Sequence, residues 1–82
     1  MLYLKRTKGM LENLGMTVTA GAAENGQESL NATIETKRGT FSVFAIAEGA
    51  RLLKPNGTSK YLYECTDGKL SAVVRQTIKA NN

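Results

Sequence analysis

Histidine and tryptophan are absent from the sequence, and cysteine and proline each occur once. Without histidine, neither a Ser–His–Asp triad nor a Cys–His pair can be assembled within one chain. Structural zinc is almost always held by several cysteine or histidine ligands, and Cys65 is the one such residue here. A single cysteine also excludes an internal disulfide. We therefore expect a protein that is not an enzyme and that holds no metal or cofactor. The least favoured alternative is an enzyme that uses carboxylate or lysine chemistry, or a site shared between subunits.

Long hydrophobic stretches are missing as well. No segment approaches the ~20 apolar residues that a membrane-spanning helix needs. Residues 1–6 place their apolar side chains before their charges, which reverses the order found in a secretory signal. The sequence thus predicts a cytoplasmic protein without a membrane partner.

The chain has the length and composition of one small domain. Its 82 residues are 41% hydrophobic and 22% charged, both near the ordinary globular range. A chain of this size buries about 60% of its unfolded surface, which is enough for one core within residues 1–82.

The net charge of +4 is distributed unevenly. The charged residues among 1–8 are all basic, and those among 9–48 are mainly glutamates. Bases again outnumber acids in residues 49–82. Both ends of the sequence are therefore basic, and its middle is acidic.

Apolar residues with helical spacing occupy the first part of the chain, at Leu4, Met10, Leu11 and Leu14. Gly15 follows them where a left-handed residue commonly ends a helix. The pattern predicts a helix that begins near Thr7, or somewhat earlier, and ends near residue 13 or 14. The alternative is a short strand over residues 2–6 with the helix after it.

Alternating apolar and polar residues then predict two half-buried strands, over residues 16–22 and 30–35. Asn25-Gly26 lies between them and is a hairpin signal, because both residues readily adopt positive φ. Lys37-Arg38-Gly39 predicts the next hairpin turn.

Residues 40–47 are apolar on both faces of a strand. Phe41 and Val43 point to one side, whereas Phe44 and Ile46 point to the other. This pattern predicts the central strand, with its second face covered by the helix or by another chain.

The last third of the chain is less clearly patterned. Residues 47–54 are ambiguous, because the apolar residues from Ala47 to Leu53 suit a helical turn and residues 51–54 suit a short edge strand. Pro55-Asn56-Gly57-Thr58 predicts a tight turn, and residues 60–65 predict a strand. Residues 69–80 suit a strand or a helix equally by periodicity, and the hairpin signal Thr66-Asp67-Gly68 before them favours a strand. The whole pattern predicts an α+β fold with an N-terminal helix packed on a four- to five-stranded antiparallel meander sheet.

Basic turns and neighbouring tyrosines form the candidate partner-binding set: Lys37, Arg38, Lys54, Lys60, Tyr61 and Tyr63. Lys37 and Arg38 interrupt an otherwise acidic stretch on a protruding hairpin. The turns match no phosphate-binding motif, and a solvated hairpin tip is their more common role.

Tyr61 and Tyr63 share one face of the strand over residues 60–65. Aromatic residues on an open sheet can stack single-stranded bases. A chain with few aromatics favours packing of both rings on the core instead. Cys65 continues the same alternation, which predicts a buried, unreactive thiol.

These observations favour a small, non-catalytic interaction protein. We expect it to bind a larger protein or nucleoprotein through an exposed surface, as inhibitors and regulators encoded by phages and mobile elements do. A homodimer is compatible with the sequence. The alternative is a small basic DNA- or RNA-binding domain that uses its hairpin turns and one patch of bases near the termini, namely Lys5, Arg6, Lys8, Arg75 and Lys79.

Overall fold

The polypeptide is arranged as a helix, five strands and a second helix. The computed structural model describes residues 1–22 and 26–82. In chain order, its elements are α1 (Leu4–Asn13), β1 (Thr17–Ala22), β2 (Glu28–Thr36), β3 (Gly39–Ile46), β4 (Gly49–Leu53), β5 (Ser59–Tyr63) and α2 (Asp67–Ala80).

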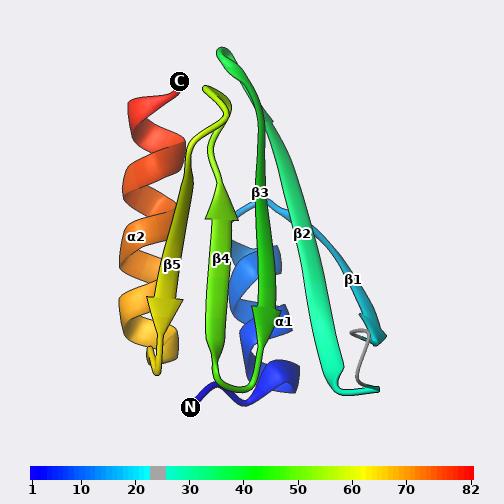
Figure 1. Cartoon of the computed structure of the whole chain (residues 1–82). Helices are drawn as coiled ribbons and strands as arrows, with labels where there is room; N and C mark the ends of the chain where they lie inside the picture. Colours follow the sequence, from blue (N-terminus) through cyan, green and yellow to red (C-terminus); the bar gives the residue numbers. More distant parts are fainter. Residues whose placement is uncertain (23–25) are drawn as a thin grey trace.

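The strands form one antiparallel sheet in the order β1-β2-β3-β4-β5, so that each strand pairs with the next along the chain. Both helices lie on the same face of this sheet, behind it in Figure 1. The predicted α+β fold, with an N-terminal helix on an antiparallel meander sheet, is therefore confirmed. β3 is the central strand, as its two apolar faces predicted.

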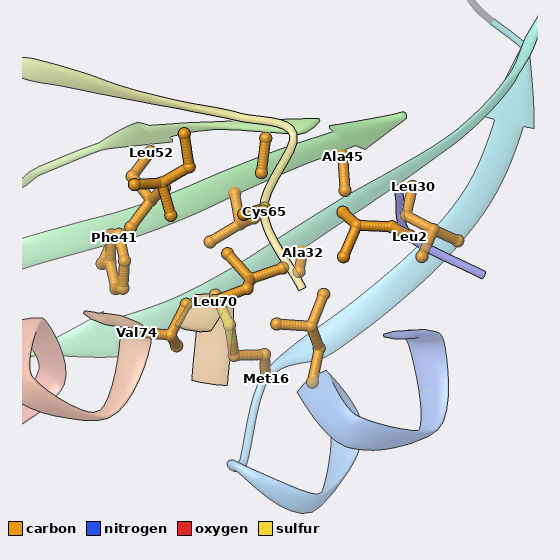
Figure 2. Packing of buried hydrophobic residues seen from close by; sticks show 14 residues of the cluster. Leu2, Met16, Leu30, Ala32, Phe41, Ala45, Leu52, Cys65, Leu70 and Val74 are labelled. Carbon is orange, nitrogen blue, oxygen red and sulfur yellow. The ribbon is translucent and has the colours of Figure 1, made fainter. Parts of the chain in front are cut away.

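The hydrophobic core lies between the sheet and the two helices (Figure 2). Alternate residues of the strands point into it, among them Phe41 and Leu52, which are fully buried. Leu11 of α1 and Leu70 and Val74 of α2 close the core from the other side. The remaining side chains of the same strands consequently face away from both helices.

α1 begins at Leu4, which excludes the alternative of a strand over residues 2–6. It ends at Asn13, and Gly15 adopts a φ of 93° where the chain turns toward β1, as the predicted helix end requires. The Thr7 hydroxyl, which is buried, donates a hydrogen bond to Asp67 Oδ1 at 2.6 Å. This bond ties the first half of α1 to the beginning of α2.

α2 corrects the sequence prediction, which favoured a strand over residues 69–80. Thr66 caps the helix, because its side-chain oxygen accepts a hydrogen bond from the backbone nitrogen of Lys69 at 3.2 Å. Asp67 lies in the first turn, where a carboxylate is favourable. Buried residues follow with helical spacing at Leu70, Val74 and Thr77. The segment interpreted as a hairpin turn is therefore the start of a helix.

The structure also settles the ambiguous residues 47–54 and differs from the sequence prediction in β1. The ambiguous residues 47–54 contain β4, so the sheet has five strands without the C-terminal segment. In β1, Ala20 and Ala22 were expected on a buried face but are exposed, because this end of the strand extends past the helices (Figure 1). Asn25 of the predicted hairpin turn lies outside the described residues.

Candidate functional site

The sheet surface that faces away from the helices carries large apolar side chains together with one base. We call this surface the open face and define it by Phe44, Ile46, Arg51, Leu53, Tyr61 and Tyr63. These residues come from β3, β4 and β5. They alternate along each strand with the core residues, so their side chains point to the opposite face of the sheet. Phe44 and Ile46 are half-buried, and the other members of the open face are exposed.

The strand register brings the members of the open face together. Phe44 is paired with Arg51, and Arg51 is paired with Tyr61, so the three form one row across the sheet. In the next row, Ile46 is paired with Gly49 and Gly49 with Tyr63. Direct cross-strand neighbours lie about 5 Å apart, so Phe44, Arg51 and Tyr61 form a continuous row, whereas Gly49 leaves a gap between Ile46 and Tyr63.

Tyr61 and Tyr63 are 54% and 77% exposed, so the expectation that both rings pack on the core is wrong. Leu62 between them fills the core position instead. The two rings are stacked, with their centroids 5.9 Å apart and their planes 8° from parallel. The stack holds two aromatic side chains in a fixed orientation above the sheet.

A hollow of about 830 Å³ lies on the open face, lined by the side chains of Phe44, Ile46, Arg51, Tyr61 and Tyr63. Gly49 forms its floor. A Cβ atom built on Gly49 would overlap the carbonyl oxygen of Leu62, so β4 and β5 can approach one another here only because this residue is glycine. The hollow is wide and mostly apolar, and it suits a protruding apolar group.

Carboxylates border one end of the hollow. Glu48 lines it and accepts a hydrogen bond from Gln27 Nε2 at 2.5 Å. The backbone nitrogen of Glu64 donates to the carbonyl oxygen of Glu48 at 2.8 Å, which places the two glutamates beside each other at the end of β5. The Tyr63 end of the open face is thus acidic at its border.

The opposite end of the molecule is basic, at the top of Figure 1, where two hairpin tips and the end of α2 meet. The structure brings these segments together through Gly39, whose built Cβ would lie 3.4 Å from Pro55 Cβ, and through Asn82, whose Oδ1 accepts from the backbone nitrogen of Lys37 at 3.2 Å. We call this region the basic end and define it by Lys37, Arg38, Lys54, Lys60 and Lys79.

Four of the six residues predicted to bind a partner therefore share the basic end, and the other two, Tyr61 and Tyr63, lie on the open face. Lys54 and Lys60 line a second hollow of about 250 Å³ together with Gln76, Thr77 and Asn81 of the α2 segment. This hollow is small and polar.

The alternative nucleic-acid set is divided between α1 and α2. The Thr7–Asp67 hydrogen bond places Lys5, Arg6 and Lys8 of α1 near the first turn of α2. Arg75 and Lys79 follow Asp67 by eight and twelve residues, which corresponds to about 12 and 18 Å along the helix axis. Arg75 and Lys79 thus lie farther along α2 than this contact, and the single patch of bases near the termini stays a prediction.

Cys65 is buried, as predicted, but it does not share a face with the tyrosines. Glu64 adopts a positive φ of 52°, which breaks the alternation after Tyr63 and turns Cys65 into the core. Burial raises the pKa of the Cys65 thiol. Among the described residues, no group of histidine, cysteine or carboxylate side chains could hold a metal ion, and no helix is long and apolar enough to cross a membrane.

Sequence reasoning missed Arg51 and Leu53 as parts of the site. Residues 47–54 lacked a clear period, so their strand and its register could not be assigned. Phe44 and Ile46 carried a usable signal, since a strand that is apolar on both faces needs a second cover.

Comparison with known proteins assigns no family to this fold and site. The chain matches no protein-family model, and searches of curated proteins and of solved structures gave no significant match.

Proposed function

We propose that this chain is a non-catalytic interaction protein that binds a larger protein through the open face. The observation that carries the proposal is the exposed Tyr61–Tyr63 stack beside Arg51 and Phe44. Tyrosine, arginine and other aromatic residues are the side chains most enriched at the energetic centres of protein interfaces. The stacked rings are already ordered, so binding them costs little side-chain entropy.

The charge distribution favours a protein over a nucleic-acid strand on this surface. Arg51 is the single base of the open face, Glu48 lines the hollow, and the backbone of Glu64 is hydrogen-bonded to that of Glu48. A strand with phosphates at regular spacing would meet these carboxylates when its bases stack on Tyr63. A protein surface can place apolar groups over the tyrosines, an acid near Arg51 and a base near the glutamates.

The shape of the open face favours a convex occupant. An apolar hollow of about 830 Å³ accepts a ridge, such as one side of a helix or a loop with large side chains. Two concave faces of the same kind leave a gap when they meet, so a second copy of this chain fits less well. A small protein that covers a surface of its partner in this way would act as an inhibitor or regulator of that partner.

The test compares two exposed tyrosines on different sides of the molecule. Tyr63→Ala removes a ring of the open face, and Tyr3→Ala removes a ring that is 67% exposed just before α1. Each tagged protein, and the wild type, is used to capture proteins from its host cells. The captured protein is then purified and titrated against all three proteins by calorimetry.

We expect the wild type and Tyr3→Ala to bind the captured protein with the same affinity. Tyr63→Ala is expected to raise Kd about 30-fold, the equivalent of losing about 2 kcal/mol at an interface centre. Equal binding by all three proteins would show that the partner does not use the open face, and the proposal would then fail.

A further inference from the structure

We infer that the basic end is a second binding surface, which contacts the phosphate backbone of double-stranded DNA. It lies at the hairpin tips and the last turn of α2 (Figure 1), and none of its five bases lines the hollow of the open face. The inference does not depend on the protein-binding role of the open face.

The bases of the basic end are available to a ligand. Within the described part of the chain, the side-chain nitrogens of Lys37, Arg38, Lys54, Lys60 and Lys79 form no ion pair and no hydrogen bond. Glu35 is the nearest carboxylate along β2, and it accepts a hydrogen bond from the Thr40 hydroxyl. The five bases outnumber the nearby Glu35 carboxylate, so the end keeps a net positive charge.

The composition of the basic end favours phosphate over a protein surface. Apart from the bases, the two hairpin tips consist of glycine, proline, asparagine, serine and threonine. A stable protein interface needs buried aromatic or apolar anchors, and these tips offer none. Contact with phosphates needs no such anchor, because its free energy comes largely from counterion release.

The basic end also fits a duplex better than a single strand. Recognition of single-stranded nucleic acid relies on aromatic rings that stack on bases. Tyr61 follows Lys60 directly, but its ring projects from the open face and not from the hairpin tips. The two tips belong to neighbouring hairpins, so their centres are separated by about two strand spacings, or about 10 Å. They can therefore contact separate phosphates of one duplex, whose charge density is high.

The experiment measures binding of the full chain to a fluorescent DNA duplex about two helical turns long, by anisotropy between about 50 and 200 mM KCl. One variant, Lys37→Gln with Arg38→Gln, removes two bases from the basic end. The matched control, Lys5→Gln with Arg6→Gln, removes the same charge from α1. A third variant, Tyr63→Ala, alters only the open face. Circular dichroism and thermal melting confirm that all four proteins are folded.

If every base of the basic end contacts one phosphate, the wild-type affinity falls about 500-fold over this salt range, with a logarithmic slope of about −4.5. The Lys37→Gln, Arg38→Gln variant is expected to reduce the slope to about −2.7, so that its affinity falls about 40-fold. The Lys5→Gln, Arg6→Gln control and Tyr63→Ala should retain the wild-type slope.

Several outcomes would overturn the inference. One is a wild type that does not bind the duplex at about 50 mM KCl. A second is an equal loss in the two charge variants, which would show a general effect of net charge. A third is tighter binding of oligo(dT) that Tyr63→Ala abolishes, which would assign single-stranded DNA to the open face. A fourth is equally tight binding of poly-L-glutamate, which would favour an acidic protein at the basic end.

Discussion

The buried side of α2 allows a sharp test of the fold, because the same residues suit a strand by periodicity. Leu70 is 0% exposed and Val74 is also fully buried, whereas Ala72 is exposed. In a strand, all three residues would point to the same face. In the observed helix, Ala72 lies away from the other two. Comparing Leu70→Ala with Ala72→Lys therefore separates the two structures.

The expected effects differ greatly in size. Leu70→Ala removes a fully buried side chain and should cost about 3 kcal/mol. A domain of 82 residues has a free energy of unfolding of about 4–12 kcal/mol, so this loss is a large part of the total. At about 4–8 °C per kcal/mol, the Tm of Leu70→Ala should fall by about 12–24 °C. Ala72→Lys places a charge on an exposed position and should change stability by about 0.5 kcal/mol or less.

Both variants can be measured by urea unfolding and by thermal melting followed by circular dichroism. The wild-type and variant transitions should have the same dependence on urea concentration, so that a shift in midpoint reports stability. An Ala72→Lys protein that is as unstable as Leu70→Ala would refute the helix, because it would place Ala72 in the core.

Other parts of the structure give further predictions. Gly49→Ala should destabilise the fold by about 2–3 kcal/mol in urea unfolding, because its Cβ would overlap the Leu62 carbonyl, and a neutral result would contradict this close approach. Gly9→Ala should raise stability by about 1 kcal/mol, since Gly9 lies inside α1 with nothing within 4 Å of its built Cβ, and a lower Tm would count against this. Phe44→Asp should remain folded and keep the wild-type size by light scattering, because Phe44 lies on the open face, whereas a smaller size than the wild type would show that a second chain covers this face. Burial raises the pKa of the Cys65 thiol, so the unfolded chain loses the thiol proton at a lower pH than the folded protein does. The folded state therefore loses stability as the pH rises from the ordinary thiol pKa to the raised pKa of the folded protein. Cys65→Ala should therefore lose less stability at alkaline pH than the wild type, and identical pH profiles would exclude this linkage.

Local patterns were sufficient for much of the fold. The spacing of Leu4, Leu11 and Leu14, together with Gly15, predicted α1 and its end, because helix periodicity and a left-handed stop are properties of a few adjacent residues. The same holds for the hairpin at Lys37-Arg38-Gly39 and for the central position of β3. The absence of histidine is a property of composition alone, and it limits the acid–base chemistry open to the chain near neutral pH.

Tertiary contacts decided which face of each element is covered. Periodicity places Tyr61 and Tyr63 on one side of a strand, but it does not show that the helices lie on the other side. Residues 69–80 form a helix because Thr66 caps its first turn and because Leu70 and Val74 are buried in the core formed with the sheet and α1.

The candidate surfaces likewise depend on segments that are distant in sequence. Arg51 lies between Phe44 and Tyr61 only through the register of three strands. Lys37 and Lys54 share one end of the molecule because two hairpin tips touch. Sequence patterns extend over a few residues, and these arrangements are set by strand pairing and helix docking across the whole chain.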